Sequence, residues 1–119
     1  MALIFLILCI LHTDTVPVRL VNGNGNSSGR VEVHFNSEWG TACDDGWDLN
    51  AATVVCKQLG FEGAVSVRPM AYFGEGSAVI GLDETHCTGK ELNILNCNHS
   101  AWKYHNCLHS EDVGVECGG

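Results

Sequence analysis

The fold is decided by the stretch Trp39-Gly40-Thr41-Ala42-Cys43-Asp44-Asp45-Gly46-Trp47-Asp48. Its first five residues, 39–43, can form a β-strand that returns from a turn. The strand ends at a cysteine that is followed at once by two carboxylates, Asp44 and Asp45. A strand, a candidate crosslink and an acidic pair are therefore adjacent in the chain.

The residues upstream of this stretch predict the partner strands. Residues 30–35 alternate cleanly with period two, and residues 36–38 turn the chain, so a hairpin with 39–43 is expected. Residues 16–21 alternate like an edge strand and then enter a Gly- and Asn-rich loop over 22–29.

The residues downstream predict one main helix over residues 50–60. Asn50 is placed to cap it and Gly60 to end it. Its apolar residues recur at helical spacing and include a cysteine: Ala52, Val55, Cys56 and Leu59. Beyond the helix we expect short strands at 71–73 and 78–80, a short helical segment at 90–96 and a closing strand at 113–117.

The chain begins with an uninterrupted apolar run at residues 3–11, about half of what crosses a bilayer. We interpret residues 1–15 as a signal peptide and 16–119 as a single domain. Cys9 would leave with the leader. The six remaining cysteines form an even set, typical of an oxidising compartment, for which fifteen pairings are possible. They are Cys43, Cys56, Cys87, Cys97, Cys107 and Cys117.

The net charge of −8 argues against non-specific binding of nucleic acid or anionic lipid. We therefore expect no nucleic-acid specificity and no membrane insertion by the mature domain. Cations or basic partners fit the average charge better. Nothing in the sequence carries an enzyme motif, neither a Gly-x-Ser-x-Gly elbow nor a His-Glu-x-x-His pair, so we expect a non-catalytic protein.

The motifs together resemble those of the scavenger receptor cysteine-rich domain. The resemblance covers residues 18–117 and rests on several motifs in the family's order and spacing. They are Val18-Arg19-Leu20-Val21, Gly29-Arg30-Val31-Glu32-Val33, residues 39–48, Val54-Val55-Cys56-Lys57-Gln58-Leu59-Gly60, Cys87-Thr88-Gly89-Lys90-Glu91, His105-Asn106-Cys107 and residues 110–117.

The resemblance implies a compact α+β module stapled by disulfides, with a curved antiparallel sheet cradling one main helix and a short second helix. It resembles the six-cysteine group A, because the extra cysteines of group B would fall near Ser27 and at Phe61. It implies the disulfides Cys43–Cys107, Cys56–Cys117 and Cys87–Cys97.

The resemblance also implies a cation site, because a Cys43–Cys107 bond would draw two acidic pairs together. Oxygen ligands suit Ca²⁺ or Mg²⁺. One site maps onto Asp44, Asp45 and Glu111, and a second onto Asp45, Asp83 and Asn106 with Glu111 shared. The alternative is a solvated acidic rim neutralised by Lys or Arg. Zinc at Cys97, His99, His105, Cys107 and His109 is disfavoured, because an exported chain oxidises the thiolates that zinc needs.

Two N-glycosylation sequons begin at Asn26 and Asn98, and we expect Asn26 in the Gly- and Asn-rich loop to be the better occupied. Trp39, Trp47 and Trp102 are interpreted as packing aromatics. The sequence thus predicts a secreted glycoprotein, or the extracellular part of a membrane protein. It would bind polyanionic or glycoprotein ligands, microbial surfaces included, through bound calcium, as in innate immunity. The alternative is an interaction or spacer module of a larger extracellular protein, without cation-dependent binding.

Overall fold

The computed structural model describes residues 15–118. The expected signal peptide and Cys9 therefore lie outside the described residues, except for Thr15 at its end. Within the described part of the chain, no helix combines the length and the apolarity that crossing a bilayer requires.

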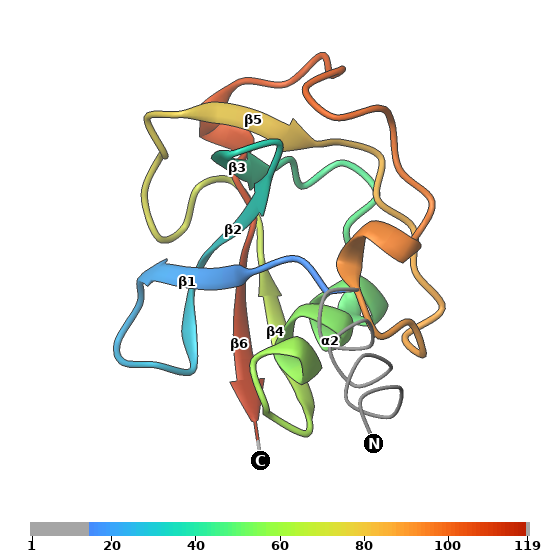
Figure 1. Cartoon of the computed structure of the whole chain (residues 1–119). Coiled ribbons are helices and arrows are strands. Elements are labelled where there is room, and N and C mark those ends of the chain that lie inside the picture. The colour runs from blue at the N-terminus through green and yellow to red at the C-terminus, as the bar shows by residue number, and fades with distance from the viewer. Residues whose placement is uncertain (1–14, 119) are drawn as a thin grey trace, which may run out of the picture.

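A six-stranded sheet forms the body of the molecule (Figure 1). Its central path runs β4-β6-β2-β3-β5, and β1 pairs with the other edge of β2. The strands are β1 (Val18–Asn22), β2 (Ser28–Phe35), β3 (Glu38–Ala42), β4 (Gly63–Arg68), β5 (Val79–Leu82) and β6 (Gly114–Gly118).

The hairpin that the sequence predicts is formed by β2 and β3, which pair antiparallel from Glu32–Thr41 to Phe35–Glu38. Asn36 and Ser37 connect the strands with φ angles of 51° and 65°. Positive φ at both central residues is the geometry whose twist matches that of the flanking strands. The predicted edge strand is confirmed as β1, antiparallel to β2.

The sheet is mixed, because β3 and β5 pair in parallel with Gly40 opposite Val79. One local prediction was wrong in this region, and one strand was missed. Residues 71–73 form a turn, since Met70 and Ala71 have φ angles of 60° and 52° that a strand does not allow. The strand β4 was not predicted at all; it is defined by its antiparallel pairing with β6.

The main helix is α2 (Leu49–Gln58), one residue out from the predicted start. Its N-cap is Asp48 and not Asn50: the Asp48 carboxylate accepts hydrogen bonds from the backbone N–H groups of Asn50 at 2.9 Å and Ala51 at 3.1 Å. Gly60, with φ 95°, follows the helix as predicted. The expected helix at 90–96 shortens to a 3₁₀ turn, η1 (Ile94–Asn96), and a second turn, η2 (His109–Glu111), precedes β6.

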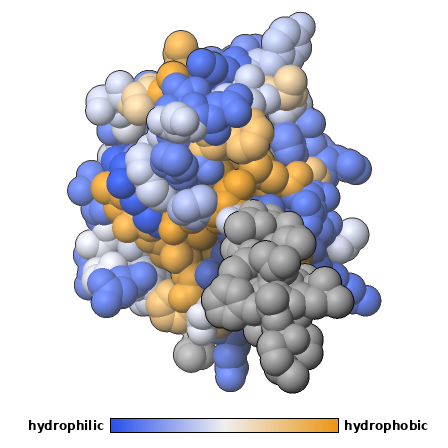
Figure 2. Space-filling model, in the orientation of Figure 1, coloured by the Kyte–Doolittle hydropathy of each residue, from blue (hydrophilic) through white to orange (hydrophobic). Residues whose placement is uncertain are grey.

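The core lies between α2 and the sheet. Ala51, Ala52, Val54 and Val55 of the helix are fully buried against strand residues such as Val31 and Val115. Trp47 is also buried, while Trp39 and Trp102 are half-buried, so all three tryptophans pack as expected. On the surface, hydrophobic residues gather across the middle of the face in Figure 2 and hydrophilic residues occupy much of its edge.

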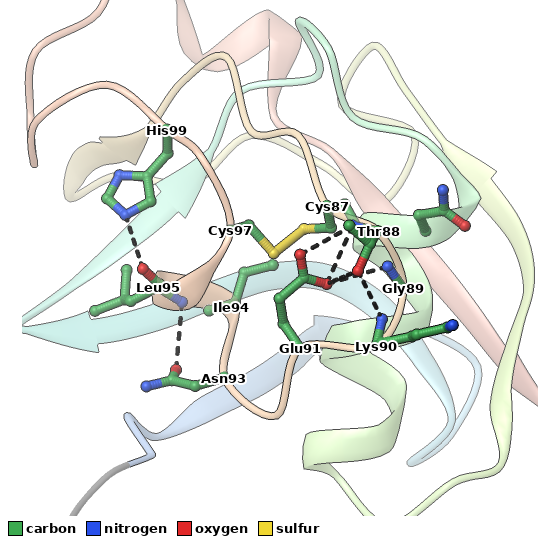
Figure 3. The surroundings of a disulfide bond; sticks show 12 residues. Cys87, Thr88, Gly89, Lys90, Glu91, Asn93, Ile94, Leu95, Cys97 and His99 are labelled. Carbon is green, nitrogen blue, oxygen red and sulfur yellow. Dashed lines mark hydrogen bonds between the residues drawn. A yellow bond between two sulfur atoms is a disulfide. The ribbon is translucent and has the colours of Figure 1, made fainter.

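Three disulfides connect these elements, and they join the pairs that the family resemblance implies. Cys56–Cys117 links α2 to β6 inside the core. Cys43–Cys107 links the end of β3 to the segment before η2. Cys87–Cys97 closes a short loop in which the Glu91 carboxylate accepts hydrogen bonds from Thr88 and Gly89 (Figure 3).

Loss of Cys56–Cys117 should destabilise the domain more than loss of Cys87–Cys97. The two bonds span 61 and 10 residues, and in the chain-entropy model they contribute about 4 and about 3 kcal/mol. We therefore expect Cys56→Ala/Cys117→Ala to abolish or nearly abolish cooperative unfolding in urea, and Cys87→Ala/Cys97→Ala to retain a weakened transition. The reverse order of the two midpoints would contradict this assignment.

Candidate functional site

Acidic and amide side chains surround the disulfide between Cys43 and Cys107. Four of them place an oxygen within 4 Å of one of its sulfurs. The distances to Cys107 Sγ are 3.4 Å for Asp83 Oδ1, 3.8 Å for Asp45 Oδ2 and 3.9 Å for Asn106 Oδ1, and Glu111 Oε2 lies 3.7 Å from Cys43 Sγ. The structure thus brings together all four residues of the second predicted site.

The parallel pairing of β3 and β5 explains how residues distant in sequence meet. The carboxyl ends of parallel strands lie at the same edge of a sheet, and Ala42 is opposite Leu82 at that edge. Asp45 follows β3 in a tight turn, and Asp83 follows β5 directly. Glu111 arrives from the other side, because the backbone N–H of Asp44 donates to the Glu111 carbonyl at 2.9 Å.

Asp45 is the shared member of two carboxylate groups. Its carboxylate lies within 4.8 Å of that of Glu111, and within 4.8 Å of those of Asp83 and Glu84. Glu84 was not predicted. It is presented by a left-handed backbone conformation, φ 53°, and its N–H donates to Asp83 Oδ1 at 2.8 Å. We call Asp45, Asp83, Glu84 and Glu111 the acidic cluster.

Asp44 lies beside the acidic cluster but has a separate contact. Its Oδ2 accepts a hydrogen bond of 2.9 Å from the backbone N–H of Met70. It therefore ties the turn at residues 70–73 to the site. Of the three residues of the first predicted site, the structure places the carboxylates of Asp45 and Glu111 close together. Asp44 is adjacent to Asp45 in the chain, but its carboxylate is not part of this group.

The acidic cluster is electrostatically strained. Burial, together with the charges of Glu111, Asp83, Asp44 and Glu84, raises the pKa of Asp45. Within residues 15–118, no Lys or Arg forms an ion pair with a cluster carboxylate. Four basic groups pair elsewhere, with Glu32, Glu38 and Glu116: they are Arg19, Arg30, Arg68 and Lys103. Among the described residues, one imidazole lies within ion-pair distance of a cluster carboxylate: His86, whose Nε2 is 3.6 Å from Glu84 Oε1. The alternative of neutralisation by Lys or Arg finds no support.

The chemistry of these donors suits a hard cation. A pocket of about 300 Å³ opens beside two cluster residues, Asp83 and Glu84, and is also lined by Ser100, Tyr104, His105 and Asn106. Carboxylate and amide oxygens are ligands for Ca²⁺ or Mg²⁺. The sulfurs nearby are bonded to each other, which removes them as zinc ligands. A larger pocket, about 590 Å³, beside Val16, Lys57 and Leu92 contains no carboxylate and lies apart from this chemistry.

The histidines that the sequence analysis considered as zinc ligands form hydrogen bonds within the protein. His105 Nδ1 accepts the backbone N–H of Cys107 at 3.0 Å, and His99 bonds to the carbonyls of Leu95 and Ser100. His109 Nδ1 lies 2.8 Å from the buried carboxylate of Asp112. These imidazoles therefore have structural roles around the site.

Comparison with known proteins places this geometry in a family. Residues 21–118 match the model of the scavenger receptor cysteine-rich domain. The chain is 54% identical over 102 residues to a scavenger receptor cysteine-rich domain superfamily protein of Patiria pectinifera. The match covers 86% of this chain but only 9% of that much longer protein.

Solved structures agree. The third such domain of murine neurotrypsin is 50% identical with a TM-score of 0.79, over 86% of this chain and 95% of that one. The domain of mouse MARCO, in its dimeric form, is 44% identical with a TM-score of 0.72, over 85% and 94%.

Neutralising Asp45 should stabilise the cation-free domain. With chelator at neutral pH, Asp45→Asn should raise the unfolding midpoint by a few degrees at most, since about 1 kcal/mol moves a domain of this size by roughly 4–8 °C. The pKa of Asp45 is raised on folding, so its ionised form costs stability above that pKa. The advantage of the variant should therefore disappear as the pH falls through the raised pKa and wild type protonates.

Glu91→Gln is the opposite control. Hydrogen bonds from Thr88 and Gly89 lower the pKa of Glu91, so its charge is stabilising above the ordinary Glu range. The midpoint of this variant should fall at neutral pH. Thermal scans from acid to neutral pH measure both, and a lower midpoint for Asp45→Asn in chelator would refute the repulsion.

Proposed function

This chain belongs to the scavenger receptor cysteine-rich domain family, and we propose that it is a non-catalytic module that binds polyanionic or glycoprotein surfaces through Ca²⁺. Domains of this family are extracellular receptor-type modules. The observation that carries the proposal is the acidic cluster, whose carboxylates lie within 4.8 Å of Asp45 without an ion-pairing Lys or Arg in residues 15–118.

The chain's own oxygens supply a partial coordination shell. Asp45 is the central ligand because it borders both carboxylate groups. Asp83 is almost fully buried and fixed by the N–H of Glu84, which makes it a rigid donor. Glu84 and Asn106 are exposed and Glu111 is half-buried, so these three face incoming ligands.

Bound Ca²⁺, or Mg²⁺, would convert an acidic surface into one that attracts sulfate, phosphate, sialate or carboxylate groups. Few protein carboxylates with water completing the shell give weak sites, in the roughly 10⁻⁴ to 10⁻³ M range of extracellular modules. Such an affinity suits a compartment rich in calcium. Microbial surfaces that display these anionic groups are the class of partner that we infer, with a role in innate immunity.

We also infer that the domain is of the six-cysteine group A. The three disulfides use all six cysteines of residues 15–118, and Ser27 and Phe61 stand where group B is expected to have two more. We further propose that the protein is extracellular. It would be either secreted after removal of residues 1–15 or the extracellular part of a longer membrane protein.

Terbium luminescence provides a direct measurement of the site. Tb³⁺ resembles Ca²⁺ in its preference for oxygen ligands, and Tyr104 in the pocket wall can sensitise its emission. Wild type should show saturable emission that Ca²⁺ competes away and should be retained on immobilised heparin only with Ca²⁺. Asp45→Asn and Glu111→Gln should each weaken Tb³⁺ binding by about tenfold or more, as loss of about 1.4 kcal/mol or more implies.

Glu62→Gln is the charge-matched control. Glu62 is exposed, and its backbone is paired with Gly118, so it belongs to a different part of the sheet from the acidic cluster. This variant should keep wild-type Tb³⁺ and heparin binding. If all four proteins were retained equally on heparin in chelator, the calcium-bridging mechanism would be wrong. The alternative, an interaction module that binds without a cation, would then take its place.

A further inference from the structure

We propose that an N-linked glycan on Asn98 regulates access of macromolecular ligands to the acidic cluster. The inference rests on the proposed function, because it concerns the same site. It adds a covalent modification as the regulator and a carbohydrate as its chemical class. The argument depends on where the sequon Asn98-His99-Ser100 lies relative to the cluster.

The backbone geometry fixes the direction of the Asn98 side chain. Asn98 is exposed and forms an isolated antiparallel bridge with His86. The two residues exchange both hydrogen bonds, His86 N–H to Asn98 O at 2.8 Å and Asn98 N–H to His86 O at 3.0 Å. Residues directly opposite each other in such a pair project their side chains on the same face, about 5 Å apart at Cβ. A glycan on Asn98 therefore begins beside the His86 ring.

The His86 ring, in turn, lies against the acidic cluster. Its Nε2 is 3.6 Å from Glu84 Oε1. The ring also packs over Gly46, the neighbour of Asp45, so closely that a Cβ at Gly46 would lie 2.8 Å from its Cε1. The His86 ring thus connects the sequon to Glu84 and to Gly46, the residue after Asp45, so a glycan on Asn98 would begin one side chain away from the cluster.

The other end of the sequon belongs to the pocket itself. Ser100 lines the pocket together with Asp83 and Glu84. Its backbone N–H donates to the Asp83 carbonyl at 3.1 Å. The last residue of the sequon is therefore part of the pocket wall.

The base of the glycan would be held rigidly. The disulfide Cys87–Cys97, drawn in Figure 3, joins the residues that directly follow His86 and precede Asn98 in the chain, so it adjoins the bridge between them. His99 is fixed by its two ring contacts, to Leu95 O at 3.2 Å and to Ser100 O at 2.7 Å. A glycan anchored on such a frame keeps its first sugars near the cluster, whereas one on a loose loop would swing away.

A glycan in this position discriminates by size. A hydrated cation can pass beside the sugars, while a polysaccharide or a microbial surface must displace them. Incomplete occupancy of Asn98 would then create two populations, one open to large ligands and one closed. Asn26 offers the internal comparison, because it lies in the β1–β2 connection and has no contact with the cluster among the described residues.

The test uses the protein made in glycosylating cells with a mannosidase inhibitor, so that endoglycosidase H can trim each glycan to one sugar. Mass spectrometry of glycopeptides gives the occupancy of Asn98, and the Asn98 glycoforms are separated on a lectin in the Asn26→Gln background, where Asn98 carries the remaining sequon. We expect the Asn98-glycosylated form to bind Tb³⁺ within about twofold of Asn98→Gln, but heparin in Ca²⁺ about tenfold or more weakly, a difference of about 1.4 kcal/mol. Trimming should restore most of the heparin affinity, and Asn26→Gln should leave it unchanged.

Absence of sugar at Asn98, or equal heparin affinity of the glycosylated and Asn98→Gln forms, would overturn this inference while leaving the calcium site intact. Failure of every form to bind Tb³⁺ would instead overturn the proposed function. The two failures are therefore separate readouts of one experiment.

Discussion

The disulfide between Cys43 and Cys107 is the constraint on which the candidate site depends. It spans 64 residues and fixes the end of β3 against the segment that leads into η2. Four oxygen-bearing side chains converge on its sulfurs, although the three carboxylates among them repel one another. A covalent bond can hold such an arrangement where hydrogen bonds alone would let the carboxylates separate. The fold thus stores electrostatic repulsion in a place where a cation would relieve it.

Hydrogen bonds between charged groups also hold the site in place, in addition to the disulfide. Glu32 accepts from both Arg19 and Arg30, and Arg30 reaches across to the carbonyl of Gly74 at 3.2 Å. Asp112, fully buried, accepts from Gly76 N–H at 2.7 Å and from His109. Burial lowers the pKa of His109, but its bonds to Asp112 and to the Ala78 carbonyl outweigh burial and raise it. These paired groups hold the connection between β4 and β5, which contacts Asp44 through Met70.

The sequence predicted the elements whose structure depends on residues close together in the chain. The period-two alternation of β2, the turn at Asn36 and the apolar face of α2 all follow from short-range sequence. The parallel β3–β5 pairing does not, because it joins segments nearly forty residues apart. β4 was missed because its form depends on β6, and Asp48 and Asn50 are both good caps that sequence cannot rank.

In the acidic cluster, too, the sequence predicted some residues and missed one. Asp45, Asp83, Asn106 and Glu111 were named through the family resemblance, since nothing local relates them. Glu84 has an equally suitable carboxylate and adjoins Asp83, and its left-handed backbone brings that carboxylate to the cluster while the residue stays exposed. One signal in the sequence could have indicated Glu84: it is an acidic residue that lies shortly after a predicted strand and next to the candidate ligand Asp83.

The position of β6 has a consequence for biosynthesis. This strand follows every other element in the chain, yet it lies between β4 and β2 in the sheet. While the ribosome is still making it, the nascent domain has two unpaired strand edges, and Cys56 lacks its partner Cys117. Cys43 and Cys56 emerge close together, long before Cys107 and Cys117, so in an oxidising compartment they would be free to bond with each other before their partners are made. Correct pairing in such a compartment would then require disulfide rearrangement after the chain is complete.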